Sequence, residues 1–241
     1  MRIQTHGMVE QPCILLLHTM FTTGLLFKEI IPPLERHFFL VIPTLDGYDP
    51  TEGTEYPGAD EELEQIEAFL REKHIRELAA AVGSSLGAML AWRLWQRRHI
   101  PIRRLVLDSP SFGWDAAVAV ENTKSFWQLA QAVQAAPNTR CVFDEHYGAF
   151  GSMMRRSCAA VTENTLRRSC ETCFGPQLPQ RIQTGRTKIL LVYGGDDPNY
   201  QYKEKILAGR TDVSLVVEPG YGHCGFLMRE PLKFAKLLME E

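Results

Sequence analysis

Short apolar runs alternate with amphipathic segments along most of the chain. A strand buried on both faces of a parallel sheet appears as a nearly unbroken apolar run of this length. Such runs predict strands over Cys13–His18, Phe38–Pro43, Glu77–Val82, Arg104–Asp108, Lys188–Tyr193 and Val213–Val217. A further short strand is expected around Arg2–Thr5, ahead of the first buried run.

Apolar residues recur at helical spacing between these runs. Leu63, Ile66 and Leu70 fall on one face of a helix predicted over Glu61–Lys73, which Asp60 could cap. Further helices are predicted over Ala88–Arg98 and about Pro231–Met239. Strands separated by helices in this way indicate βαβ units. We therefore predict an α/β fold with a mostly parallel central β-sheet flanked by helices.

The middle of the chain breaks this alternation. Residues 110–185 contain no convincing strand, whereas helices are predicted over Ala116–Ala135, Asp144–Arg155 and Thr162–Cys173. Strand signals resume at Lys188. We interpret residues 110–185 as a helical cap inserted between two strands of one sheet, so that residues 1–241 form a single domain.

Composition and charge exclude several functional classes. The 241 residues carry 26 Lys+Arg against 29 Asp+Glu, a net charge of −3, so no basic surface for nucleic acid is expected. No apolar run approaches the ~18–20 residues that span a bilayer. The polar segment Met1–Pro12 lacks the apolar region of a secretory signal, which favours a cytoplasmic location.

The six cysteines could in principle form disulfides, but reduced thiols are the better expectation for a cytoplasmic chain of this size. Cys170 and Cys173 form a C-x-x-C pair, and Cys158 and His146 are nearby in sequence. Zinc binding is conceivable there. Since the spacing lacks a second clean ligand pair, we predict no metal site.

The strongest chemical signal is the pentapeptide Gly83-Ser84-Ser85-Leu86-Gly87, a G-x-S-x-G pattern between a predicted strand and a predicted helix. A sharp turn at this junction would hold the Ser85 hydroxyl clear of the sheet, and the two glycines would let strand and helix approach closely. The helix N-terminus would direct N–H groups toward developing negative charge. Ser85 is therefore the candidate nucleophile.

A serine nucleophile needs a base, and the base needs an acid that orients it. When the chain order is serine, acid, histidine, the base must follow both partners, which favours His223 in a glycine-rich loop after the last strand. We prefer Asp197 as the acid because it lies three residues after Gly194 and directly before Pro198, in the loop at the end of a predicted strand. Asp196 and Asp108 remain alternatives.

This arrangement resembles the α/β-hydrolase family over essentially the whole chain from Cys13. In that family a His-Gly pair and an oxyanion-hole residue follow the first buried strand, and His18-Thr19-Met20 stand there in this sequence. The resemblance implies that the backbone N–H groups of Met20 and Leu86 form the oxyanion hole. Thr19 departs from the family, because a β-branched residue resists the positive φ that glycine allows. Either the loop takes another local conformation or glycine is not needed there.

The expected activity is cleavage of a small, apolar carboxylic ester through an acyl-enzyme, without metal or organic cofactor. Thioester, amide or C–C bond cleavage on the same triad, or a non-catalytic ligand-binding relative, remain open. Serine argues against the dehalogenases and epoxide hydrolases of the family, which carry aspartate. Aromatic and methionine side chains that could line an apolar pocket above Ser85 are Phe21, Phe112, Phe150, Met153 and Met154.

Overall fold

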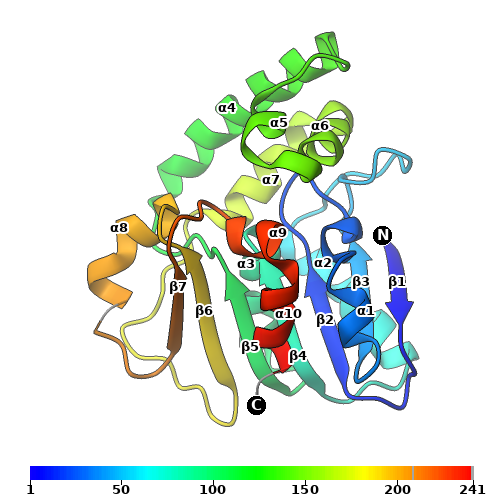
Figure 1. The fold of residues 1–241 in the computed structure, drawn as a ribbon, viewed down its shortest axis with the longest axis vertical. Coiled ribbons are helices and arrows are strands. Elements are labelled where there is room, and N and C mark those ends of the chain that lie inside the picture. The colour runs from blue at the N-terminus through cyan, green and yellow to red at the C-terminus, as the bar shows by residue number, and fades with distance from the viewer. Residues whose placement is uncertain (208, 240–241) are drawn as a thin grey trace.

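The computed structural model describes residues 1–207 and 209–239, with a seven-stranded sheet at its centre. The strands lie in the order β1-β3-β2-β4-β5-β6-β7 (Figure 1). Their bounds are β1 Arg2–His6, β2 Cys13–Leu17, β3 Phe39–Thr44, β4 Leu78–Ser84, β5 Ile102–Asp108, β6 Lys188–Gly194 and β7 Ser214–Glu218. Only β1 pairs antiparallel, with β3, and every other pairing is parallel. The predicted α/β fold class is confirmed.

Helices cover both faces of the sheet, because alternate side chains of the buried strands point to opposite sides. On one face, Leu15 and Leu17 of β2 share a core with α2 (Ala59–Glu72) and α3 (Leu86–Arg97). On the other face, Ile14 and Leu16 of β2 pack in a second core with a set of short helices. These are η1 Gly24–Phe27, α1 Ile31–Leu34, α9 Gly225–Arg229 and α10 Pro231–Met239.

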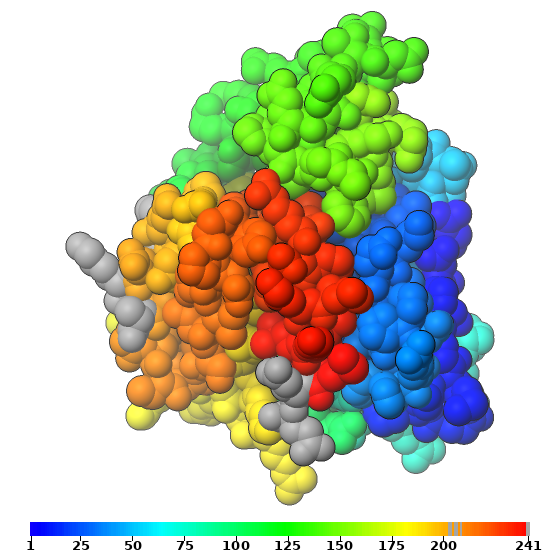
Figure 2. Space-filling model, in the orientation of Figure 1, coloured from blue at the N-terminus to red at the C-terminus, as the bar shows by residue number. Residues whose placement is uncertain are grey.

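The segment between β5 and β6 is helical, and its helices lie together above the carboxyl ends of the strands (Figure 1). They are α4 Ala116–Ala135, α5 Val142–His146, η2 Gly148–Phe150, α6 Gly151–Ala160 and α7 Glu163–Cys173. Figure 2 shows this segment as a green mass on top of the molecule. Hydrogen bonds tie it to the loop after β3: Tyr48 donates to Ser169 Oγ over 2.7 Å, and Ser157 donates to the Tyr48 carbonyl over 2.8 Å. After β6, α8 (Pro198–Leu207) follows the loop that carries Asp197.

Two local predictions are wrong. Asp60 does not cap α2, which begins at Ala59 after Gly58, because its carboxylate instead accepts a hydrogen bond from Arg93 Nε over 2.8 Å. The single helix predicted over Asp144–Arg155 is divided into α5, η2 and α6. The division follows from Gly148, which has φ +52°, and from Gly151, whose Cα lies against the backbone of Asp144.

Candidate active site

Ser85 lies at the junction between β4 and α3, at the carboxyl edge of the sheet. Its backbone has φ +51° and ψ −108°, a strained conformation for a residue with a side chain. A Cβ on Gly83 would lie 2.0 Å from the carbonyl oxygen of Gly87, and one on Gly87 would lie 2.1 Å from that of Leu17. Only glycine at both positions lets strand and helix come this close. The Ser85 N–H donates to the Asp108 carbonyl over 2.8 Å, which fixes the turn against β5.

The three residues Ser85, His223 and Asp197 form one hydrogen-bonded row. Nε2 of His223 lies 2.9 Å from Ser85 Oγ, and Nδ1 lies 3.3 Å from both carboxylate oxygens of Asp197. With Asp197 ionised, Nδ1 carries the proton, and Nε2 can accept the Ser85 proton. Asp197 is fully buried, and the N–H of Asn199 donates to its Oδ1 over 2.9 Å. The row therefore has the bonding pattern of a nucleophile, a base and an orienting acid.

The other two candidate acids, Asp196 and Asp108, make different contacts from those of Asp197. Asp196 is exposed, and its backbone N–H donates to the Tyr221 carbonyl over 2.9 Å. Asp108 is buried and accepts a hydrogen bond from the Ser84 hydroxyl. Burial raises the pKa of the Asp108 carboxyl to about 7, against the hydrogen bond from Ser84. Of the three carboxylates, Asp197 is the one within hydrogen-bonding distance of the His223 ring.

Charges shift the pKa values of this pair in opposite directions. Burial opposes ionisation of Asp197, but the hydrogen bond and charge of His223 outweigh it and lower the pKa of the carboxyl. Burial also opposes the His223 imidazolium, yet Cys224 and the Asp197 carboxylate raise the pKa of His223 well above its ordinary value. The contact between the two side chains therefore favours the ionised form of Asp197 and the protonated form of His223.

The loop after β2 brings Met20 beside Ser85, and both residues line the same cavity. Thr19 is not among the residues with positive φ, and Phe21, with φ +60°, takes that conformation instead. The Thr19 carbonyl accepts hydrogen bonds from His18 Nδ1 and Thr22 Oγ1, each 2.8 Å long. Nε2 of His18 accepts from the Leu45 N–H over 2.9 Å, and burial lowers the pKa of His18 to about 4, so its ring is neutral. The loop therefore takes another local conformation in which position 19 needs no glycine.

A cavity of about 330 Å³ lies against Ser85 and His223. Apart from Asp197 and His223 its described lining is uncharged. It comprises Met20, Ser85, Ser111, Trp114, Val118, Asn122, Phe126, Cys173, Phe174, Pro198 and Asn199. A second cavity of about 310 Å³ lies on another side of His223 and includes His146, Asp196 and Arg229 in its lining.

None of the five side chains predicted to line the pocket is among these lining residues. Phe21 stands one layer behind, with its ring 5.6 Å from that of Phe126 and 5.2 Å from that of Phe143. Phe112 packs edge-on against Trp92 at 5.1 Å. The other three lie in the helices above the sheet: Phe150 is half-buried, Met153 Sδ accepts a weak hydrogen bond from Thr23, and Met154 is buried.

The five residues singled out for the pocket do not include the side chains of α4 that line the cavity. Val118, Asn122 and Phe126 follow one another at four-residue spacing on α4, which places them on one helix face. Asn199 connects two parts of the lining, since its Oδ1 accepts from Trp114 Nε1 over 2.9 Å and its Nδ2 donates to the Ser109 carbonyl over 3.2 Å. The four-residue spacing of Val118, Asn122 and Phe126 was the sequence signal that could have placed these side chains on one face of a helix.

All six cysteines are described and carry free thiols. Cys170 and Cys173 are buried on α7, and burial raises the pKa of both thiols. Within residues 1–207 and 209–239, no three His, Cys, Asp or Glu side chains are placed to hold a metal ion. Across the same residues, no helix is long and apolar enough to cross a membrane.

The family model for the alpha/beta hydrolase family matches residues 14–237. The chain belongs to the α/β-hydrolase family. No curated protein matches the sequence significantly. Several solved structures share the fold of this α/β hydrolase at low sequence identity.

Three solved structures illustrate the likeness. A putative alpha/beta hydrolase family protein from Desulfitobacterium hafniense is 20% identical, with TM-score 0.75 over 99% of this chain and 98% of its own. A hydrolase from Pseudomonas aeruginosa PA01 is also 20% identical, with TM-score 0.77 over 98% and 92%. The enol-lactonase from Burkholderia xenovorans LB400 is 16% identical, with TM-score 0.78 over 99% and 94%. At these identities the likeness shows the fold alone.

Proposed function

We propose that this α/β hydrolase is a serine hydrolase that cleaves a small carboxylic ester by acyl transfer to water. The single observation that carries the proposal is the row Ser85–His223–Asp197, with its 2.9 Å and 3.3 Å hydrogen bonds. In the first half-reaction, Ser85 Oγ attacks the ester carbonyl while His223 Nε2 takes the hydroxyl proton. His223 then returns this proton to the leaving alcohol, and the acyl group remains on Ser85.

In the second half-reaction, His223 takes a proton from water, whose oxygen attacks the acyl carbon. His223 then returns this proton to Ser85 Oγ as the bond between Oγ and the acyl carbon breaks, which releases the carboxylic acid and free Ser85. Asp197 holds the imidazole in the tautomer that both steps require and stabilises the transient imidazolium. The N–H groups of Met20 and Leu86 bind the oxyanion of the two tetrahedral intermediates. This reaction needs neither metal nor organic cofactor.

The cavity beside Ser85 supports an uncharged acyl group. Outside the proposed triad its described lining contributes no charged side chain, and Val118, Phe126 and Phe174 make part of its wall apolar. An ionised acyl chain would lose its hydration there without a compensating cation. A volume of about 330 Å³ suits a short or medium acyl chain. One of the structures with this fold is named an enol-lactonase, which is consistent with the proposal.

We further propose that residues 110–185 act as a cap on a single α/β domain formed by residues 1–241. Helix α4 supplies Val118, Asn122 and Phe126 to the cavity, so this segment forms part of the binding site and not a separate unit. Hydrogen bonds from Tyr48 and Ser157 support this reading, since they join the helices to the loop after β3.

Labelling with a fluorophosphonate probe tests the proposal directly. The probe should modify Ser85 in the folded protein, and Ser85→Ala and His223→Ala should abolish the adduct. Labelled protein without turnover of p-nitrophenyl esters would direct attention to thioesters, amides or C–C bonds. A folded protein that forms no adduct would overturn the serine-hydrolase assignment in favour of a non-catalytic binding role.

A further inference from the structure

Ser109, the residue that follows β5, is fully buried behind the proposed triad. It comes directly after Asp108 at the carboxyl edge of the sheet, and it lines neither of the two cavities beside His223. Its hydroxyl therefore has no part in binding a substrate or in the proposed bond-breaking steps. The contacts of this buried hydroxyl indicate a different role.

The backbone of Ser109 has φ +55°, in the left-handed region where a residue with a side chain is strained. Its N–H donates to the Val192 carbonyl of β6 over 2.8 Å, and its carbonyl accepts from Asn199 Nδ2 over 3.2 Å. These two bonds hold the turn in place. Glycine would take the same backbone without strain, so the Ser109 side chain is held there at a cost in free energy.

The Ser109 hydroxyl joins the loop of the base to the loop of the acid. Its oxygen accepts a hydrogen bond from the Cys224 N–H over 2.9 Å, and Cys224 directly follows His223. Because an amide N–H can only donate, the hydroxyl keeps its own proton for an acceptor. Burial opposes ionisation of Asp197, whereas His223 and a hydrogen bond from Ser109 lower the pKa of its carboxyl. One side chain thus contacts both loops of the triad.

Two carboxylates, Asp197 and Asp108, compete for the single proton of this hydroxyl. Burial raises the pKa of Asp108 to about 7 against hydrogen bonds from Ser84 and Ser109, so this carboxyl is partly protonated near neutral pH. Asp197 stays ionised, and an ionised carboxylate can accept about four hydrogen bonds. A hydrogen bond to a charged acceptor is about twice as strong as one to a neutral acceptor. The Ser109 proton therefore goes to Asp197.

We propose that Ser109 is a positioning residue whose hydroxyl holds the carboxylate of Asp197 and the loop of His223 at the separation that the triad needs. This role rests on the proposed serine-hydrolase function, because Ser109 acts only through these two residues. Without the hydroxyl, the two loops can move apart and lengthen the 3.3 Å contact between Nδ1 and the carboxylate. Since displacements of about 1 Å in a catalytic group slow the chemical step, the rate falls while substrate binding is kept.

Two substitutions separate the hydroxyl from the backbone strain. Ser109→Ala removes the hydroxyl and keeps the strained Cβ, whereas Ser109→Gly removes both. With p-nitrophenyl acetate as substrate, kcat should fall about tenfold in both variants while KM stays within about twofold, because both lack the same hydrogen bond to a charged group.

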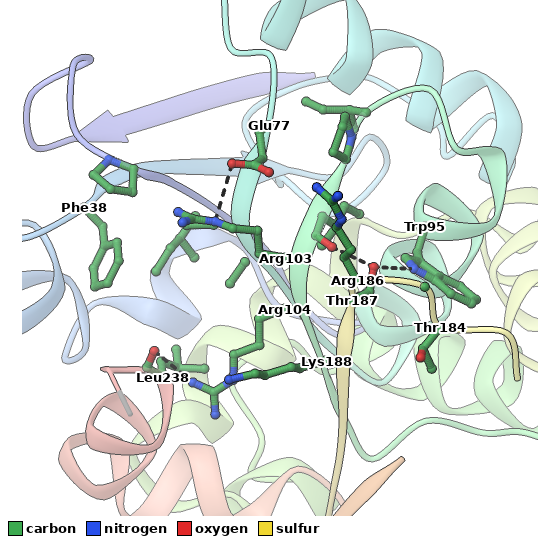
Figure 3. A pocket seen from close by; sticks show the side chains of 18 of the residues that line it. Phe38, Glu77, Trp95, Arg103, Arg104, Thr184, Arg186, Thr187, Lys188 and Leu238 are labelled. Carbon is green, nitrogen blue, oxygen red and sulfur yellow. Dashed lines mark hydrogen bonds and ion pairs between the residues drawn. The ribbon is translucent and has the colours of Figure 1, made fainter. Parts of the chain in front are cut away.

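The matched control is Thr187→Val, which removes another buried bridging hydroxyl. The Thr187 hydroxyl accepts from Trp95 Nε1 over 3.0 Å and donates to the Ile102 carbonyl over 2.7 Å. It lies at the opposite edge of the sheet from Ser85, where it lines a cavity of about 1040 Å³ (Figure 3). T187V should therefore lower the melting temperature and leave kcat unchanged.

The titration of His223 is a readout that a merely structural role of Ser109 would not move. We expect the pKa of His223, followed by NMR of the ring C–H signals, to fall toward the ordinary value of about 6.5 in S109A and S109G. It should stay unchanged in T187V. All charged or titratable groups around the ring are retained in these variants, so the shift reports geometry. They are Asp197, Asp108, Cys224, Tyr147, His146, Asp196 and Arg229.

Wild-type kcat and a wild-type His223 titration in S109A would overturn this role of Ser109 while the hydrolase function stands. Loss in S109A together with full activity in S109G would assign the effect to backbone strain and overturn the role of the hydroxyl. An equal loss in T187V would overturn it as well, since any missing buried hydroxyl would then have the same effect. A wild type without turnover or fluorophosphonate adduct would overturn the proposed function instead. The NMR titration would then still decide whether Ser109 holds the Asp197–His223 pair together.

Discussion

Both carboxylate oxygens of Asp197 lie 3.3 Å from Nδ1 of His223. The neighbouring Asp196 is exposed and directs its backbone, not its carboxylate, to Tyr221. Asp197→Asn should therefore lower kcat by about 10³–10⁴-fold, because the amide favours the wrong imidazole tautomer. Asp196→Asn, the matched control one residue away, should stay within about twofold of wild type. Steady-state kinetics on p-nitrophenyl acetate measures both, and a larger loss for D196N would transfer the acid role to Asp196.

The raised pKa of His223 gives the activity a defined pH dependence. His223 must be neutral to accept the Ser85 proton, so kcat/KM should fall as the pH drops through the pKa of the free enzyme. Since Cys224 and the Asp197 carboxylate raise this pKa, the acid limb should lie above the ordinary histidine value of about 6.5. In D197N the residual activity should show the limb at lower pH. An acid limb unchanged between wild type and D197N would contradict the pairing.

The protonation of Asp108 should make the free energy of unfolding depend on pH. Burial raises the pKa of its carboxyl to about 7 in the folded state, against about 3.9 in the unfolded chain. Between these values the folded state binds one more proton than the unfolded state. The stability of the wild type relative to Asp108→Asn should therefore fall as the pH rises from about 4 to about 7, by up to about 1.4 kcal/mol per pH unit. Urea unfolding of both proteins at several pH values measures this slope, and a constant difference would show that Asp108 is ionised throughout.

The strands and the turn that carries Ser85 could be predicted from the sequence because their signals are local. The apolar run Cys13–Leu17 is buried along its whole length, and Gly83 and Gly87 stand where strand and helix touch. The cavity lining could not be predicted in the same way. Whether Phe150 or Phe126 faces Ser85 depends on how α4 and α6 lie across the sheet, and both side chains satisfy the same aromatic criterion. The local conformation at position 19 could not be predicted either. The positive φ that the family's glycine would allow there occurs two residues later, at Phe21.

The close contact at Gly87 should be sensitive to one methyl group. A Cβ on Gly87 would lie 2.1 Å from the Leu17 carbonyl oxygen, so Gly87→Ala requires β2 and α3 to separate. We expect a loss of about 3 kcal/mol or more in the free energy of unfolding, together with loss of activity. Gly53→Ala is the control, because nothing lies within 4 Å of its added Cβ. Thermal and urea unfolding compare the two, and similar stability of G87A and G53A would show that the turn is looser than the structure indicates.

The length of the acyl chain should be limited by Phe126 and not by Phe150. Phe126 lines the cavity beside Ser85 from the face of α4 that also carries Val118 and Asn122. Phe126→Ala removes an aromatic ring from that wall, so the preferred p-nitrophenyl ester should shift to a longer acyl chain. Phe150→Ala, which also truncates an aromatic side chain above the sheet but outside the cavity lining, should keep the wild-type preference. The measurement is kcat/KM across esters from acetate to decanoate, with melting temperatures recorded to separate pocket effects from destabilisation. A change in the preferred chain length in F150A without one in F126A would place the acyl chain under α6. The sequence analysis expected the pocket there, from Phe150, Met153 and Met154.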